Sequence, residues 1–315
     1  MATQAATVPV VGVAARRSEG VWRDAWSRLR RNRLAVVGLV LVVLLLIAAI
    51  IGPMVTPWPY YVQDTKALTA NDFRAIPPFR DPSHVLGTDP NGRDMLSLLL
   101  DGAQISMTVA FVVQIVVILI GVPIGAIAGW FGGRIDNLLM RLTDVVYAFP
   151  DLLFIVLLSV AFRDTAIGHA LNGVLLVFIA IGIIAWVTVA RLVRGQLLSL
   201  KETEFVEAAQ AIGVSDFNIV VRHLVPNAIG PVIVAITLGI PGAILAEATL
   251  AFIGVGVQPP RASWGALISL GVDQIRIYPW LTFLPGLLIA TALMSFTFLG
   301  DGLRDALDPK LKGKQ

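Results

Sequence analysis

Residues 204–226 read EFVEAAQAIGVSDFNIVVRHLVP and lie between two segments that are apolar enough to cross a bilayer. The spacing i, i+3, i+4 and i+7 of the first apolar residues predicts a helix with one flat apolar face. These residues are Phe205, Ala208, Ala209 and Ile212. Glu204 and Glu207 lie off that face, and Gly213 is suited to end the helix in a left-handed conformation.

A second short helix is expected directly afterwards, capped by Ser215 or Asp216 and stopped by Pro226. Its apolar face repeats the pattern at Phe217, Val220, Val221 and Leu224. Two short helices of this kind suit a plug that inserts into a groove on another protein. The alternative is an amphipathic hairpin that rests on lipid headgroups.

The composition of the whole chain is that of a membrane protein. Hydrophobic residues make up 57% of the 315 residues, charged residues make up 14%, and the mean hydropathy is +0.81. The absence of cysteine excludes disulfides, thiolate catalysis, cysteine-ligated zinc and iron–sulfur clusters. The three histidines (His84, His169 and His223) have no ligand spacing, so we expect no metal site.

Six segments are long and apolar enough to span a bilayer core of about 30 Å as helices. They are residues 34–53, 103–128, 137–162, 171–195, 228–253 and 279–300. The first of them is expected to be an uncleaved signal-anchor rather than a cleaved signal peptide, because its apolar run begins far from Met1. The sequence therefore predicts an all-α, polytopic bundle of six spans in the cell (inner) membrane.

The distribution of basic residues predicts the orientation of this bundle. Seven arginines precede the first span: Arg16, Arg17, Arg23, Arg28, Arg30, Arg31 and Arg33. With the N-terminus inside, the inner segments hold 17 Lys and Arg, among them Lys310, Lys312 and Lys314, and the outer loops hold 7. The positive-inside rule therefore places both termini and residues 204–226 in the cytoplasm.

The sequence lacks the motifs of an energy-converting enzyme. No Gly-x-x-x-x-Gly-Lys-Ser/Thr phosphate loop is present, because the only Gly-Lys pair, Gly313-Lys314, is followed by the last residue. No motif suggests an intramembrane hydrolase. We therefore expect no catalytic residue, no cofactor and no nucleic-acid partner.

Glycines and prolines in the spans carry information about packing. Gly121, Gly125 and Gly129 recur at every fourth residue, a spacing that lets another helix approach closely. Four prolines interrupt predicted spans: Pro123, Pro150, Pro241 and Pro285. The backbone groups that they free need partners, which a packed bundle or a water-lined cavity supplies.

Several blocks of sequence resemble one family. Glu207-Ala208-Ala209, Gly213 and Pro226 are similar to the EAA loop of permease subunits of bacterial ABC importers, although His223-Leu224-Val225-Pro226 departs slightly from the usual Ile-x-Leu-Pro ending. Three further blocks are similar to the dipeptide/oligopeptide/nickel branch: LGTDPNGRD at 86–94, SWG at 263–265 and LGDGLRDALDP at 299–309. The arginine-rich tail before the first span resembles the C-type subunit of that branch.

This resemblance implies a type I ABC importer permease fold with cytoplasmic coupling helices. It implies a second, B-type permease subunit, two cytoplasmic ATP-binding subunits and an extracytoplasmic solute-binding protein as partners, with peptide as cargo in a lipid membrane. The implied ATPase-coupling residues are Glu204, Phe205, Glu207, Ala208, Ala209, Ile212 and Gly213. Nickel chelates or other small solutes are the alternative cargo, and a secondary transporter or channel is the alternative class.

The implied organisation has five parts: a basic cytoplasmic tail (1–33), the first span (34–53), an extracytoplasmic loop (54–102), a core permease domain (103–300) containing the EAA loop (201–226), and a cytoplasmic tail (301–315). The outer loop is long enough for a small ordered cap. Its sequence predicts a turn at Asp89-Pro90-Asn91-Gly92 and an interfacial helix over residues 93–101.

Three acidic residues lie inside predicted spans, where an unpaired charge costs at least about 2.5 kcal/mol. We expect Asp144 to pair with Arg141, one helical turn away. Asp151 is expected either to cap a kink after Pro150 or to line the translocation path. Glu247 is expected either to line the path or to hold a neighbouring helix.

Overall fold

A computed structural model describes residues 21–308, and in that range the chain is almost entirely helical, with isolated bridges as the only β-type pairings. Arg16, Arg17 and the terminal lysines lie outside the described residues. The helices before the centre of the chain are α1 (Val21–Arg31), α2 (Arg33–Val55), α3 (Thr65–Ala70), α4 (Met95–Phe131), α5 (Gly133–Tyr147), α6 (Asp151–Phe162) and α7 (Ala166–His169). After them come η1 (Ala170–Gly173), α8 (Val174–Lys201), α9 (Glu204–Ala211), α10 (Asp216–Asn218), η2 (Ile219–Leu224), α11 (Val225–Phe252), α12 (Trp264–Val272) and α13 (Trp280–Leu307).

Five stretches of helix are long and apolar enough to cross a membrane, and each contains one of the predicted spans or all but one terminal residue of it. The sixth predicted span, 137–162, is not one straight helix. It is divided into α5 and α6, which meet at 79°, so the bundle has six spans if this bent pair counts as one. The break lies at Pro150, whose ring disfavours helical geometry in the residue before it.

The glycine repeat of α4 forms a close helix contact, as predicted. A Cβ added at Gly125 would lie 2.3 Å from the carbonyl oxygen of Ala190 in α8. Carbons added at Gly121 and Gly129 would lie 2.8 and 2.9 Å from carbonyl oxygens one turn before and one turn after it. The backbones of α4 and α8 therefore touch along three successive turns.

The loop between α2 and α4 is an ordered cap on one end of the bundle. His84 is buried in it, stacked on Trp58, with its Nδ1 2.9 Å from a carboxylate oxygen of Asp94. Asp94 in turn accepts from the backbone N–H of Ser97 (2.8 Å) and so caps α4. Residues 95–101 are consequently the first turns of α4: the predicted helix over 93–101 is present from residue 95, but it is continuous with the spanning helix.

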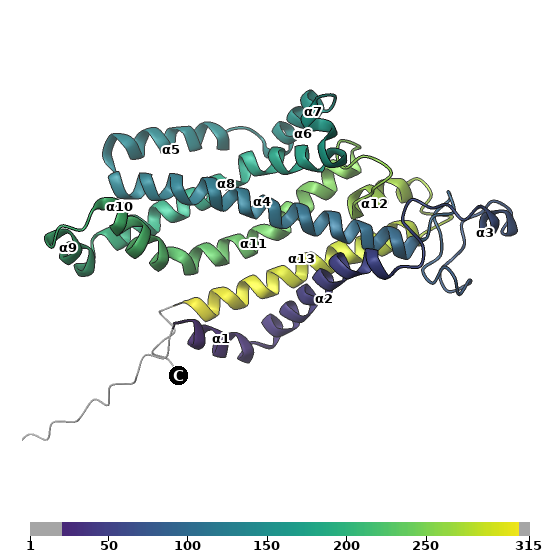
Figure 1. Ribbon diagram of the computed structural model, residues 1–315, viewed down its shortest axis with the longest axis horizontal. Coiled ribbons are helices and arrows are strands. Elements are labelled where there is room, and N and C mark those ends of the chain that lie inside the picture. The colour runs from purple at the N-terminus through teal and green to yellow at the C-terminus, as the bar shows by residue number, and fades with distance from the viewer. Residues whose placement is uncertain (1–20, 309–315) are drawn as a thin grey trace, which may run out of the picture.

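Two details of the cap agree with its sequence. The amide of Gly92 donates to the Asp89 carbonyl (3.0 Å), and Gly92 is left-handed (φ +77°), which confirms the predicted turn. Asp64 caps α3, and the hydrogen bond from the Ala67 amide lowers the pKa of the Asp64 carboxyl. Figure 1 shows α3 at one end of the long axis of the molecule and α9 with α10 at the other.

Candidate functional site

The loop between α8 and α11 is built as a rigid projection. Helix α9 ends in a Schellman motif, in which Gly213 N–H donates to Gln210 (3.0 Å) and Val214 N–H donates to Ala209 (3.1 Å). Gly213 has φ +82°, which confirms the predicted left-handed end. Val206 is fully buried and fixes α9 to the bundle core, a contact that the face-based pattern did not identify.

The outward side of α9 carries most of the predicted coupling residues. Phe205 is 41% exposed and Ile212 is 81% exposed, although both are large and apolar. The other outward residues are Glu204, Glu207, Ala208 and Gly213, and Ala209 is half-buried. The result is a convex, apolar surface with two carboxylates beside it, for which the described chain supplies no cover.

The second helix of the loop differs from its prediction. Pro226 does not stop it, since α10 and η2 continue directly into α11. Pro226 has no N–H for the carbonyl of Arg222, and its ring would collide with that carbonyl in α geometry. The chain adopts a wider π turn instead, in which the Val225 amide donates to Val220.

This π turn also splits the predicted apolar face. Ile219 and Leu224, five residues apart, are both fully buried, whereas Phe217 and Val221 are exposed. Phe217 therefore extends the exposed apolar surface of α9 instead of anchoring its own helix. We call Phe205, Ile212 and Phe217 together the knuckle.

Ion pairs hold the helices from which the knuckle projects. Asp136 of α5 receives two hydrogen bonds from the Arg194 guanidinium of α8, the second at 2.6 Å. Lys201, at the end of α8, donates to the carbonyl of Trp130 in α4 (2.7 Å) and lies 5.2 Å from the centre of that tryptophan ring. Sequence reasoning missed both contacts because each joins residues more than 50 positions apart.

Asp144 has a different partner from the one predicted. It pairs with Arg191 of α8 at 2.8 Å, not with Arg141 of its own helix. Arg191 also lies over the ring of Tyr147, 4.7 Å from its centre. The local spacing of Arg141 suggested an intrahelical pair, but α8 approaches α5 closely enough to supply a planar guanidinium from outside the helix.

Asp151 begins α6 at the break between the two half-helices, and its side chain is exposed on this subunit. The N-cap position is Pro150, and no side-chain capping bond is formed there. The sequence predicts that Asp151 either caps the kink or lines the translocation path, and the hydrogen bond that the capping role requires is not formed. The position at the N-terminal end of a half-helix favours a carboxylate electrostatically.

Glu247 is completely buried between α11 and α4. Its Oε2 accepts a hydrogen bond from the hydroxyl of Ser106 at 3.0 Å. This geometry favours the role of holding a neighbouring helix. Within the described part of this subunit, the Glu247 side chain is not exposed to any path.

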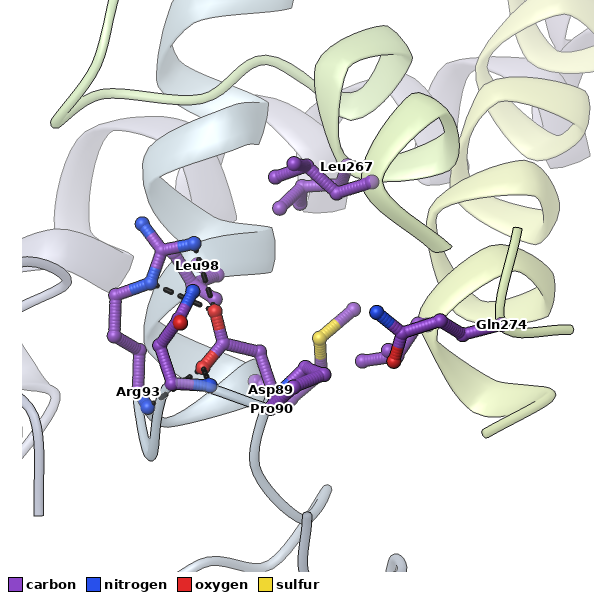
Figure 2. Close-up of a pocket in the computed structure, with 10 residues that line it drawn as sticks. Asp89, Pro90, Arg93, Leu98, Leu267 and Gln274 are labelled. Atoms are coloured by element: carbon purple, nitrogen blue, oxygen red, sulfur yellow. Dashed lines mark hydrogen bonds and ion pairs between the residues drawn. The ribbon is translucent and has the colours of Figure 1, made fainter. Parts of the chain in front are cut away.

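The cap contains a small cavity of about 110 Å³ between residues 89–98 and α12 and α13. Figure 2 shows the Asp89–Arg93 pair at its edge, with Leu267 and Gln274 on the far side. The guanidinium of Arg93 lies 2.7 Å from the Asp89 carboxylate. Ligand pockets usually measure about 300–1,000 Å³, so this cavity is too small to hold a peptide. Among residues 21–308 no cluster of three or more possible metal ligands is found.

Comparison with known proteins identifies the family. Residues 121–313 match the family described as binding-protein-dependent transport system inner membrane component. The chain belongs to this family. Residues 20–78 of this transport component match the N-terminal TM domain of oligopeptide transport permease C.

Curated relatives resemble this chain along nearly its full length. The oligopeptide transport system permease protein OppC of Bacillus subtilis is 40% identical over 297 residues, covering 94% of this chain and 92% of the relative. The dipeptide transport system permease protein DppC of the same organism is 40% identical over 291 residues, covering 92% and 86%. These relatives are permease subunits, and the chain is a multi-pass inner-membrane protein of an ABC importer, which implies partner ATPase and permease subunits.

The fold agrees with a solved transporter. A chain of the MetNI methionine ABC transporter in an inward-facing conformation superposes with a TM-score of 0.56 at 19% identity, covering 68% of this chain and 98% of that chain. The predicted fold class, an all-α membrane bundle of the type I importer kind, is thereby confirmed.

Proposed function

We propose that this subunit forms half of the translocation pathway of an importer that carries di- or oligopeptides across the inner membrane, powered by ATP hydrolysis in partner subunits. The peptide names of relatives at 40% identity support this cargo. Nickel chelates and other small solutes are the alternative cargo. Uptake of a labelled tripeptide and of nickel by cells that carry only this importer distinguishes the two.

The exposed knuckle is the observation that carries the coupling mechanism. An apolar, convex surface next to Glu204 and Glu207 fits a groove with basic or polar edges on a cytoplasmic ATPase. The buried Val206 and the Schellman end make α9 stiff, so movement of the ATPase is passed on and not absorbed. ATP-driven closure of two ATPases then moves both knuckles, one on this chain and one on the B-type subunit, and rocks the bundle between inward- and outward-open states.

The proposal includes the orientation of the chain. Both termini and the knuckle are cytoplasmic, and the cap faces the solute-binding protein that delivers cargo. The basic residues favour this orientation. Asp151 at the helix break and Glu247 are the proposed acidic residues near the path, Asp151 by direct exposure and Glu247 through the helix pair that it joins.

A matched cysteine pair tests the orientation, because the natural chain contains no cysteine. Ile212→Cys and Phe79→Cys replace residues that are both 81% exposed. Ile212 directly follows α9 and Phe79 lies in the cap with α3, and Figure 1 shows these two helices at opposite ends of the molecule. We expect a membrane-impermeant maleimide to label only Phe79→Cys in intact cells. Both variants should be labelled after permeabilisation followed by denaturation, which also removes the ATPase docked over Ile212. Labelling of Ile212→Cys in intact cells would reject the orientation and with it the docking of the knuckle.

Charge and shape changes in α9 test the coupling. Glu207→Arg and Gly213→Trp should abolish uptake while insertion into the membrane stays normal. Gly213 has open space around it, so the indole obstructs only a docked partner or strains the local φ. Arg74→Glu, an exposed charge reversal in the cap, is the control: it should keep the ATPase binding that Glu207→Arg and Gly213→Trp lose. Normal uptake by both α9 variants would refute the proposed contact.

A further inference from the structure

Helix α1 has one face fixed to the bundle and another that remains exposed. Ala25 and Leu29 are buried against Leu303, Ala306 and Leu307 of α13. The guanidinium of Arg28 also reaches the Asp308 carbonyl at 3.4 Å. Figure 1 shows α1 beside the C-terminal end of α13. The rotation of α1 about its own axis is therefore set by the protein.

The exposed face of α1 combines two tryptophans with a dense positive charge. Trp22 is 58% exposed and Trp26 is 45% exposed. Five arginines lie between positions 23 and 33, against one acidic residue: Arg23, Arg28, Arg30, Arg31 and Arg33, with Asp24. All of these arginines except Arg28 are exposed. The Arg30 guanidinium lies 4.7 Å over the centre of the Trp26 ring, so the two residue types share one surface.

The position of α1 in the chain places this surface at the boundary between lipid and water. Asn32 caps α2 by accepting from the Ala35 amide (3.2 Å), and the spanning helix begins at Arg33. Tryptophan is enriched at the headgroup level of membranes, and clustered arginines next to a span attract anionic lipids. A helix with one fixed face and a Trp/Arg face at this depth cannot turn its arginines away from the headgroups.

We propose that the exposed face of α1, together with Arg33 at the start of α2, is a binding site for anionic phospholipid, with Trp22 and Trp26 inserted among the headgroups and Arg30 and Arg33 on the lipid phosphates. Occupation of the site holds the paired inner ends of α1 and α13 at a fixed depth in the bilayer. The inference depends on the membrane location of the chain. It does not depend on peptide cargo or on docking of the knuckle, so those proposals can fail without it.

The test uses the assembled importer in nanodiscs of phosphatidylcholine and phosphatidylglycerol in equal parts. Bromine is placed on the acyl chains of one lipid at a time, and quenching of tryptophan fluorescence is measured. Subtracting the signal of a Trp22→Phe/Trp26→Phe variant isolates these two side chains from the other tryptophans. We expect brominated phosphatidylglycerol to quench them more strongly than brominated phosphatidylcholine, with a preference that falls as salt is added.

Charge removal makes the test specific. Arg30→Gln/Arg33→Gln should lower the preference for phosphatidylglycerol by about fivefold for each arginine removed. Arg74→Gln/Arg80→Gln, two exposed arginines of the cap, is the matched control and should leave it unchanged. Equal quenching by the two lipids, or an unchanged preference in Arg30→Gln/Arg33→Gln, overturns the proposal. A preference that appears only after the ATPases are removed also overturns it, because α1 would then be covered by protein in the importer.

Discussion

The contact between α4 and α8 leads to a quantitative prediction at Gly125. A side chain at this position would place its first carbon 2.3 Å from the Ala190 oxygen and 2.8 Å from the Val193 Cβ. Ordinary contacts begin near 3.4 Å, so the helices must separate by about 1 Å before the rest of the side chain is accommodated. Over-packing of this kind costs about 1–3 kcal/mol, and the three-turn length of the contact puts Gly125→Leu at the upper end.

The same substitution elsewhere in this helix pair provides the control. Gly195 lies on α8, and a Cβ built there meets no atom of the described chain within 4 Å. Gly195→Leu should therefore gain the helix propensity that glycine lacks, up to about 1 kcal/mol, without a clash. Gly125→Ala is a graded intermediate, because its single added carbon already has both close contacts.

Thermal unfolding of the purified importer, followed by the loss of its size-exclusion peak, measures the difference. We expect the midpoint temperature to be highest for Gly195→Leu, lower for Gly125→Ala and lowest for Gly125→Leu. Each 1 kcal/mol corresponds to about 2–4 °C in soluble domains of about 150–250 residues, so the shift in the larger importer should be smaller. A midpoint for Gly125→Leu equal to that of Gly195→Leu would refute direct backbone contact between α4 and α8.

Three further predictions concern polar contacts. Asp136→Ala and Arg194→Ala should each destabilise the end of the bundle that carries α9 by about 1–3 kcal/mol. A double-mutant cycle in thermal unfolding should give a coupling of at least about 0.5 kcal/mol; additive losses would contradict the ion pair. If Glu247 holds α4, Glu247→Gln and Ser106→Ala should likewise be coupled while transport per assembled importer stays normal, whereas lost transport with unchanged unfolding would favour a path-lining role. The pKa of the Asp64 carboxyl is lowered in the folded cap from its usual 3.8. The ionised carboxylate therefore stabilises the cap above pH 3.8, and this stabilisation is lost as the pH falls further. Hydrogen-exchange protection of α3 should decrease between pH 5 and pH 3 in the natural chain and change less in Asp64→Asn.

The features predicted correctly from the sequence are those that depend on neighbouring residues. Gly213 ends α9 because the left-handed conformation is a property of glycine itself. The Gly125 repeat identifies a close helix contact because every fourth residue shares one helix face. Long apolar runs predict spans in the same way, since the bilayer imposes their length.

The features that the sequence did not reveal depend on distant parts of the chain. Asp144 is paired with Arg191 because of how α5 and α8 pack, and no spacing along one helix contains that information. Val206 is the inward anchor of α9, although it lies outside the apolar face that the periodicity identified. The exposed apolar residues of the knuckle fit the helical periodicity as well as buried residues would. Which residues of α9 face inward is set by its packing against the bundle, and the local pattern does not contain that information.

The continuity of α10, η2 and α11 has a mechanical consequence. The backbone runs as helix from Asp216 to Phe252, a stretch of 37 residues, and even at an α-helical rise such a rod is about 55 Å long. Because no loop interrupts this helix, a displacement of its exposed end also moves its other end, in the opposite half of the membrane. Pro226, Pro231 and Pro241 lack a backbone N–H, so the small bending that this stretch permits should be concentrated at these three residues.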